Sequence, residues 1–401
     1  MPVLNRICCY LLLLPALALP AQDPFFTHFT GNEALFNPAM TGTLGATTFT
    51  LKNKQQWQQA GHNGYQTTAV VYEESMPCSM FDYGLSLVRD QEGQGLLKTL
   101  KMGGMLAAYV PLGRGAKSVR PADLRIGTGL HWGQQSIDFS RLTFIDQLHP
   151  KYGRVGPDQQ AILSSFAAPN GGRSDWYFQP SIGFNLRGIM LAKRDNPVFG
   201  SIGGAVHNLV PLVGREGQNW SLLGLGTSTI PRYSFHAEAE AVIKEFDRNN
   251  FLSIQPRFAG QVQGALSYLE AGLEVGFSQR LSAGVTYHTA QTNAEGEPAT
   301  NWASLHLQTG VFSFPGQRLD VGFSYNFNLS GLRNFVGNTL EFTARWSLAT
   351  STICRLRGQK ASYDGSDALQ CPTARGGMGR NKIYENIWHK TGVLDKGAKP
   401  E

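Results

Sequence analysis

Two histidines in the middle of the chain are the residues most suited to acid–base chemistry. His207 and His236 lie near Ser234 and Asn208 in the sequence. A membrane-embedded phospholipase would need a Ser–His pair and an orienting amide, because a serine hydroxyl is a weak nucleophile until a base activates it. The spacing of these residues does not require a triad, and the chain has no GxSxG, HExxH, Walker A or dinucleotide-binding motif. We therefore expect no enzymatic activity, and predict no catalytic, cofactor or metal site.

A second group of chemically active residues consists of charges set between apolar residues at alternate positions. They are Glu238, Glu240, Glu270, Glu274, Glu341 and Arg345. Successive side chains of a strand point to opposite faces, so these charges would share one face and their apolar neighbours the other. They could pair with arginines inside a polar lumen or line a conduit, and the sequence leaves both interpretations open.

The segments that carry these charges repeat with a period of two. In residues 319–327 and 340–348 every second residue is apolar, and each segment has about the length that a tilted strand needs to cross a bilayer. Similar segments lie near 44–56, 65–73, 81–89, 98–110, 122–135, 175–187, 198–206, 232–244, 251–263, 266–277, 280–289, 301–313, 318–327 and 338–348. One such hairpin would also suit a soluble β-sandwich. Their repetition in an even number, without helical periodicity, predicts an all-β fold: a transmembrane antiparallel β-barrel of about 14 strands.

Composition and the N-terminus favour export to an outer membrane. Arg6, the apolar run 7–19 and small residues after it predict a signal peptide over residues 1–21. Charged residues make up 16% of the chain and glycine 46 of 401 residues, whereas soluble domains average about 25% and about 7%. The net charge of +6 is spread out, without a basic patch between aromatics, so we expect outer-membrane lipid and no nucleic acid as partner.

Two segments fall outside the predicted barrel of residues 44–348. Residues 22–43 are irregular, and residues 349–401 lose the alternation and form a non-barrel C-terminal tail. Both ends of an even-stranded barrel lie on one side, so we predict that both termini are periplasmic. Cys354 and Cys371 could form a disulfide in that compartment. The longest predicted loop, 149–174, would fold over a surface or into the lumen.

Short motifs follow one another in a fixed order along the predicted barrel. The first are QDPFF at residues 22–26 and NPAMTG at residues 37–42, and GLSLVRD, IDFS, GAVHNL, PRY…H, YNFNLS and LEF follow. The residues that mark these motifs are Asn37, Pro38, Gly42, Trp57, Asp90, Asp138, Phe139, His207, Asn208, His236, Asn328 and Ser330. The ordered set resembles the PorP/SprF family of outer-membrane proteins of the type IX secretion and gliding machinery. A departure is the late Cys371-Pro372, after which the chain continues, so the resemblance does not cover the tail.

The resemblance implies an outer-membrane barrel of a Bacteroidota-type bacterium that assists export or surface attachment of a partner protein with a C-terminal sorting domain. In gliding relatives this partner is an adhesin. The resemblance also implies contacts with the periplasmic ring components of the machinery, and we expect residues 22–42 and 349–401 to make them. A porin or hydrophobic-solute channel is the alternative, although loop 149–174 lacks the charges of a constriction loop.

Overall fold

The protein is described by a computed structural model. It describes residues 26–27, 31–44, 47–57, 64–76, 79–93, 97–112, 122–167, 169–191, 198–210, 230–247, 250–277, 281–292, 300–314, 317–330, 337–348 and 351–357. The predicted signal peptide, residues 1–21, lies outside these residues.

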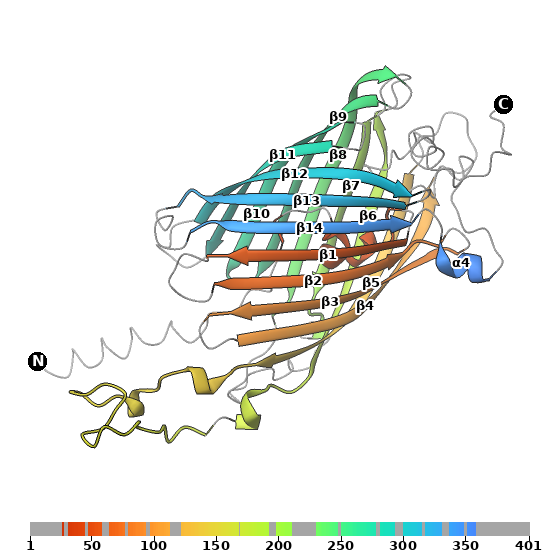
Figure 1. The fold of residues 1–401 in the computed structure, drawn as a ribbon. Helices are drawn as coiled ribbons and strands as arrows, with labels where there is room; N and C mark the ends of the chain where they lie inside the picture. Colours follow the sequence, from red (N-terminus) through yellow and green to blue (C-terminus); the bar gives the residue numbers. More distant parts are fainter. Residues whose placement is uncertain are drawn as a thin grey trace, which may run out of the picture.

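Fourteen antiparallel strands in the described part form one closed barrel, as predicted (Figure 1). Each strand pairs with its neighbours in the chain, and β14 closes the barrel by pairing with β1. The strands are β1 (Thr47–Gln56), β2 (Tyr65–Glu74), β3 (Phe81–Glu92), β4 (Leu97–Leu112), β5 (Ala122–Ser136), β6 (Tyr177–Leu191), β7 (Val198–His207), β8 (Arg232–Asp247), β9 (Asn250–Gln263), β10 (Leu266–Phe277), β11 (Leu281–Thr292), β12 (Thr300–Phe314), β13 (Gln317–Asn328) and β14 (Thr339–Leu348).

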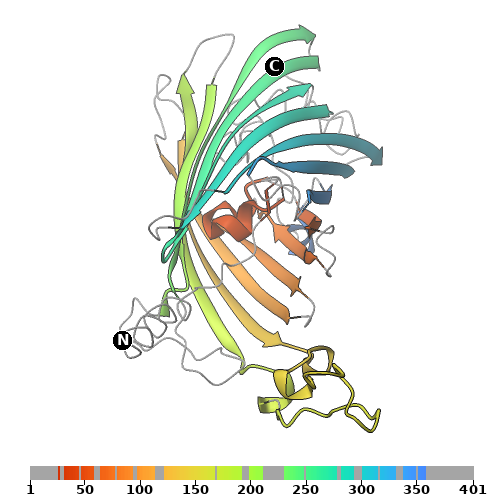
Figure 2. The same ribbon diagram turned by 90° about the vertical axis from the view of Figure 1, so that its left-hand side faces the viewer.

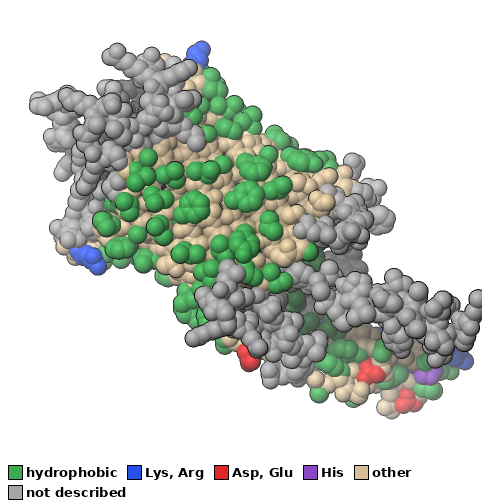
Figure 3. All heavy atoms as spheres, turned by 180° about the vertical axis from the view of Figure 1, so that it is seen from behind, with side chains coloured by type: hydrophobic (Ala, Val, Ile, Leu, Met, Phe, Trp, Pro, Cys, Tyr) green, Lys and Arg blue, Asp and Glu red, His purple; other side chains and the backbone are tan. Residues whose placement is uncertain are grey.

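The two-residue period divides the side chains between the lumen and the outer surface. On β14, Leu340, Phe342 and Trp346 are exposed, whereas Glu341 and Arg345 are buried inside. The other strands repeat this division, and Figure 3 shows a broad band of hydrophobic side chains over the outer face. Such a surface suits lipid, which solvates apolar groups, and leaves the polar groups to one another in the lumen.

Part of the N-terminal segment lies inside the barrel (Figure 2). We call Phe26, Thr27 and residues 31–44 the lumen segment; it includes α2 (Glu33–Phe36) and η2 (Pro38–Met40). Turn η2 packs against β4, β5 and β6. The prediction that residues 22–43 form a periplasmic segment is corrected for its described residues. They enter the lumen because its wall buries their apolar side chains and bonds their polar backbone groups.

Two other non-strand regions lie at opposite ends of the barrel (Figure 1). Helix α4 (Thr352–Leu356) follows β14 at one end. At the other end, residues 137–167 and 169–176 form the β5–β6 extension, with η3 (Phe139–Arg141), η4 (Ile145–Gln147) and η5 (Pro169–Gly172). The extension contains the loop predicted at residues 149–174 and projects beyond the strands instead of into the lumen (Figure 2). No helix among the described residues is long and apolar enough to span a membrane.

Candidate functional site

The lumen segment turns sharply at Asn37, where η2 begins. The Asn37 side-chain oxygen accepts a hydrogen bond from the Ala39 N–H at 3.0 Å, and its amide donates to the Phe184 carbonyl of β6 at 2.9 Å. Pro38 suits the first position of a helix, because the N–H that it lacks would have no helical partner there. The Asn-Pro pair thus begins η2 and fastens it to the barrel wall.

Glycines on the inner faces of β5, β6 and β7 make room for this turn. A Cβ at Gly127 would lie 2.2 Å from the Ala39 nitrogen, and a Cβ at Gly183 would lie 2.1 Å from Asn37 Oδ1. At Gly203 the corresponding distance to Asn37 Nδ2 is 3.0 Å. At Gly127 the neighbouring atoms are backbone, which cannot rotate away. The three strands therefore form a cradle that fits this turn closely.

A buried arginine on β5 holds the end of η2. Arg125 donates from Nε to the Ala39 carbonyl at 3.0 Å and from Nη2 to the Thr41 carbonyl at 2.5 Å. Nη2 also lies 2.6 Å from Asp82 Oδ2 on β3, and both side chains are at most 3% exposed. A guanidinium has several donors in a fixed fork, so it can bond two carbonyls and a carboxylate together.

Two further charged residues hold the chain as it leaves η2 towards β1. Arg187 on β6 is paired with Asp123 on β5 at 2.6 Å and also donates to the Thr43 carbonyl at 3.4 Å. Glu73 on β2 accepts a hydrogen bond from the Gly42 N–H at 2.9 Å. Gly42 has a φ of +72°, in the left-handed region that glycine adopts readily.

The opposite wall holds the beginning of the lumen segment through Glu341, one of the predicted lumen charges. Glu341 accepts hydrogen bonds from the N–H, at 2.9 Å, and from the hydroxyl of Thr27. Asn326 on β13 donates to the same hydroxyl oxygen at 2.9 Å, and Lys52 on β1 lies 4.0 Å from Glu341. All four residues are buried, so this wall bonds the segment as closely as the cradle does.

Arg345, the predicted charge on the same strand, connects the wall to α2. Its Nη1 lies 3.5 Å from Glu33 Oε1, and its Nη2 lies 3.7 Å from Asp320 Oδ2 on β13. The lumen segment is therefore bonded to β13 and β14 on one side and to β5 and β6 on the other.

The other four predicted lumen charges also face inward, on two neighbouring regions of the wall. They are Glu238 and Glu240 on β8, and Glu270 and Glu274 on β10. Glu240 accepts a hydrogen bond from Gln255 at 3.2 Å, and Glu270 lies 3.5 Å from Arg257, both on β9. Here, carboxylates are paired with side chains of the wall itself.

A Ser–His–carboxylate chain, which the sequence did not reveal, crosses three adjacent strands. Ser304 Oγ lies 2.7 Å from His288 Nε2, and His288 Nδ1 lies 3.4 Å from Glu270 Oε2 and 2.7 Å from the Tyr268 hydroxyl. These residue types form hydrolase triads. However, Ser304 and His288 are 0% exposed, so the hydroxyl does not face open space in the lumen. The chain is a buried polar network of the wall.

The four residues considered for catalysis gather around the lumen segment. His207 Nε2 lies 3.0 Å from the Phe36 carbonyl, and the Ser234 hydroxyl donates to that carbonyl at 2.9 Å. The His236 ring packs edge-on against the Phe36 ring, with centroids 6.1 Å apart. Asn208 points elsewhere and donates to the Ile230 carbonyl at 3.1 Å. Ser234 Oγ also lies 3.4 Å from His207 Nε2, so the structure brings this serine and this histidine together. Ser234, His207 and His236 all contact Phe36, the last residue of α2.

Two other motif residues stabilise strand ends. Trp57 follows β1 with a φ of +57°, and its backbone N–H donates to the Asn338 carbonyl at 3.4 Å. Its ring packs edge-on against the Tyr65 ring, with centroids 4.9 Å apart. Asp90 on β3 accepts a hydrogen bond from the Thr67 hydroxyl of β2 at 2.5 Å. Both roles are structural.

The later motif residues form local turns. Asp138 caps η3 by accepting the Ser140 N–H at 3.1 Å and its hydroxyl at 2.5 Å. These bonds, from the hydroxyl above all, lower the pKa of Asp138. Phe139 packs against Phe166 with centroids 5.1 Å apart. Asn328 accepts the N–H and the hydroxyl of Ser330 at 3.0 and 2.6 Å, in the same kind of turn.

The start of the C-terminal tail is fastened to the outside of the barrel. Glu74, the last residue of β2, accepts hydrogen bonds from the Ser351 hydroxyl at 2.5 Å and from the Ile353 N–H at 3.2 Å. Cys354 in α4 is disulfide-bonded. Cys371 lies outside the described residues, so the predicted pairing stays a prediction, as does the role of residues 358–401.

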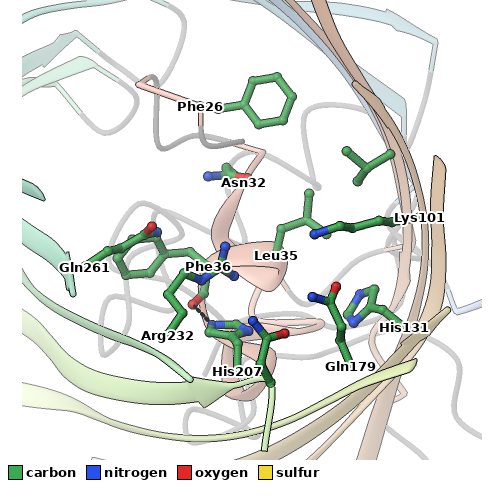
Figure 4. A pocket seen from close by; sticks show the side chains of 12 residues that line it. Phe26, Asn32, Leu35, Phe36, Lys101, His131, Gln179, His207, Arg232 and Gln261 are labelled. Atoms are coloured by element: carbon green, nitrogen blue, oxygen red, sulfur yellow. Dashed lines mark hydrogen bonds between the residues drawn. The ribbon is translucent and has the colours of Figure 1, made fainter. Parts of the chain in front are cut away.

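A pocket of about 80 Å³ lies beside the lumen segment (Figure 4). Its lining residues are Phe26, Asn32, Leu35, Phe36, Val88, Lys101, His131, Gln179, His207, Asn208, Arg232 and Gln261. Two are cations, two are histidines and four are amides. Among the described residues, no three His, Cys, Asp or Glu side chains are grouped so that they could hold a metal ion.

The family model described as "Type IX secretion system membrane protein PorP/SprF" matches residues 18–346. No curated protein matches the sequence.

Solved structures that align with the chain include outer-membrane proteins and channels at low similarity. The outer membrane protein Omp33 of Acinetobacter baumannii is 10% identical, with 76% of this chain and 100% of that chain covered and a TM-score of 0.35. The CymD monoaromatic hydrocarbon channel is 11% identical, with 79% and 92% covered and a TM-score of 0.38. We draw no functional conclusion from these alignments.

Proposed function

The chain belongs to the PorP/SprF family of type IX secretion system membrane proteins, and from this premise we propose that it assists the export or surface attachment of a partner protein with a C-terminal sorting domain. Membership makes it a β-barrel component of the type IX secretion system in the outer membrane. The partner and the step that the barrel assists are the proposed part.

The observation that carries the proposal is the lumen segment. It is bonded to two opposite walls, through Arg125 on one side and Glu341 on the other. A general porin passes solutes through a water-filled lumen, and a segment bonded to both walls opposes such passage. A barrel with an occupied lumen is better suited to binding other proteins at its two ends than to conducting solutes.

We assign the two ends of the barrel to the two sides of the membrane from the segments that lie at each end. Strand β1 begins, and β14 ends, at the end that carries α4 (Figure 1). We propose that this end is periplasmic, where residues 358–401 would meet ring components of the machinery. The β5–β6 extension would then lie at the cell surface, where an exported partner emerges.

The proposal is tested by isolating the tagged full-length barrel from its native outer membrane and identifying co-purified proteins by mass spectrometry. Recovery of ring components or of a protein with a sorting domain supports it. A variant without residues 358–401, which keeps α4 and its bond to Glu74, serves as the matched comparison. Loss of ring components alone from this variant would assign them to the tail.

Planar-bilayer recordings test the alternative of a porin or hydrophobic-solute channel. We expect no steady conductance from the full-length protein, because the lumen segment crosses the lumen. Isolation of the barrel without partners, together with steady conductance, would overturn the export role in favour of a channel.

A further inference from the structure

Helix α4 lies against the outer face of the barrel, at the end that it occupies in Figure 1. Its contact on the wall is Glu74, the last residue of β2. Glu73 faces the lumen, where it accepts the Gly42 N–H, and successive side chains of a strand point to opposite faces, so Glu74 points outward. Glu74 is nevertheless 0% exposed. The Ser351 hydroxyl and the Ile353 N–H bond it at 2.5 and 3.2 Å, so α4 covers the wall at this point.

A row of aromatic side chains lies beside this contact on the outer face. Trp346 on β14, Phe49 on β1, Tyr72 on β2 and Tyr83 on β3 follow one another, with neighbouring ring centroids 5.7, 4.9 and 5.9 Å apart. The Tyr72 hydroxyl donates to Glu74 at 2.8 Å. Aromatic side chains of membrane proteins concentrate where the hydrocarbon core meets the headgroups. We call these four residues the aromatic row, and infer that it marks the membrane boundary at this end.

The aromatic row places α4 at the level of the lipid headgroups. Glu74 lies two residues beyond Tyr72 on β2. This is a rise of roughly 7 Å along the strand, and less along the bilayer normal, because the strands of such barrels are tilted. The headgroup region extends about 5–8 Å beyond the hydrocarbon core on each side of a bilayer. Since α4 is bonded to Glu74, it lies within this region.

The exposed residues of α4 combine an apolar side chain with positive charge. Ser351 and Cys354 are buried, whereas Arg355, Leu356 and Arg357 are exposed, Leu356 by 80%. Neither guanidinium is paired with a carboxylate in the part of the chain that the structure describes. An exposed leucine between two arginines is costly in water but suits the boundary of an anionic membrane, where the apolar group and the charges each find a partner.

We propose that the C-terminal end of α4 is an interfacial anchor: Leu356 enters the lipid, and Arg355 and Arg357 bind the phosphates of anionic phospholipids in the leaflet that borders this end. A guanidinium fork bonds phosphate oxygens, and its apolar stem can lie along the lipid while the charge stays at the headgroups. The charge of this surface and its continuity with the lipid-facing wall both favour lipid over a protein partner.

The anchor would fix the place where the C-terminal tail begins. Residues 358–401 follow α4 in the sequence, so an anchored α4 holds their starting point at the membrane surface. The proposal depends on the outer-membrane location of the barrel and not on its role in export, so either can fail without the other.

Native mass spectrometry of the full-length barrel in detergent tests the charge partners. The probes are dioleoylphosphatidylglycerol, which is anionic, and dioleoylphosphatidylcholine, which has the same acyl chains and no net charge. We expect the anionic lipid to bind at least about fivefold more tightly, the effect of a single arginine at an anionic lipid surface. The double variant Arg355→Gln/Arg357→Gln should lose most of this preference.

The matched control is Arg154→Gln/Arg173→Gln, which removes two exposed charges from the β5–β6 extension at the opposite end. It should keep the preference for the anionic lipid. Heat-modifiable migration on gels confirms that each barrel is folded. A preference that the α4 variant retains, or that the control loses to the same extent, would overturn the proposal.

Photo-crosslinking identifies what contacts the exposed end of α4. Benzoylphenylalanine replaces Leu356, the variant is irradiated in its native outer membrane, and the adducts are identified by mass spectrometry. The bonds of Ser351 and Ile353 to Glu74 do not involve the replaced side chain, so α4 should stay in place. Phospholipid adducts support the anchor. Adducts with a protein instead, or no phospholipid adduct from a folded barrel, would overturn it.

Discussion

The lumen segment and the β5–β6 extension use the same local bonds in opposite environments. Asn37 caps η2 in the lumen and Asp138 caps η3 in the extension, each through an N–H two residues later. An arginine–carboxylate pair accompanies each turn. The Arg125–Asp82 pair is 3% and 1% exposed, whereas the Arg141–Asp138 pair is 55% and 44% exposed.

The difference shows that burial, more than the type of bond, decides how much such a segment contributes to the stability of the barrel. A buried charge that loses its partner stays in a low-dielectric site without compensation, whereas an exposed charge returns to water. The lumen segment should therefore be part of the cooperative structure of the barrel. The extension should open locally without unfolding the strands.

The largest effect is expected from Arg125→Met. This change removes the donor to two carbonyls and leaves Asp82 buried without its guanidinium partner, at a cost of roughly 3–5 kcal/mol in the free energy of unfolding. Denaturant unfolding of the barrel in detergent measures it. Adding Asp82→Asn should restore part of the stability. A loss no larger than that of Arg141→Met would contradict the distinction between the two segments.

A smaller loss is expected from Gly127→Ala. The added Cβ would collide with the backbone of Pro38 and Ala39, and such overpacking costs about 1–3 kcal/mol. Gly104→Ala on β4 is the matched control, since a Cβ there meets its nearest neighbours at 3.9 Å. Thermal unfolding followed by gel migration compares the two. Equal midpoints would mean that the cradle does not hold the segment.

Lowering the pH should loosen the extension while the barrel stays folded. The Ser165 N–H, with the hydroxyls of Ser165 and Ser164, lowers the pKa of Asp146 from its ordinary value of 3.8. The opened extension then binds more protons than the closed one, so closure is favoured above about pH 3.8 and is lost as the pH falls further. Pepsin cleavage within residues 143–166, followed by mass spectrometry, should therefore rise as the pH falls from 4 to about 2.5.

The variant Asp146→Asn separates this carboxylate from other acid effects. It should raise cleavage at pH 4 and reduce the dependence on pH, because an amide does not titrate in this range. Cleavage with the same pH dependence in the variant would place the switch in another group.

The smallest effect is expected from Arg141→Met. It breaks an exposed ion pair whose groups water can solvate, so the unfolding midpoint of the barrel should not change measurably. Denaturant unfolding under the conditions used for Arg125→Met gives the comparison. A shift close to that of Arg125→Met would remove the contrast on which these predictions depend.

The alternation of apolar and polar residues in the sequence was enough to predict the barrel, and also which side chains of a strand face the lumen. Fourteen segments with a two-residue period correspond to the fourteen strands, since alternation follows from local backbone geometry and needs no partner. The same periodicity pointed Glu341 and Arg345 towards the lumen. Motif residues at turns, such as Asn328 and Asp138, act through neighbours two residues away.

The position of residues 31–44 was decided by the tertiary structure alone. Asn37-Pro38 reads as an ordinary turn in the sequence, but its cradle comes from glycines on three strands, and the residues that hold the segment lie 31 to 314 positions away along the chain. The Ser304–His288–Glu270 chain was hidden for the same reason. No local period encodes such contacts, because they form only when barrel closure brings the inner faces of distant strands together.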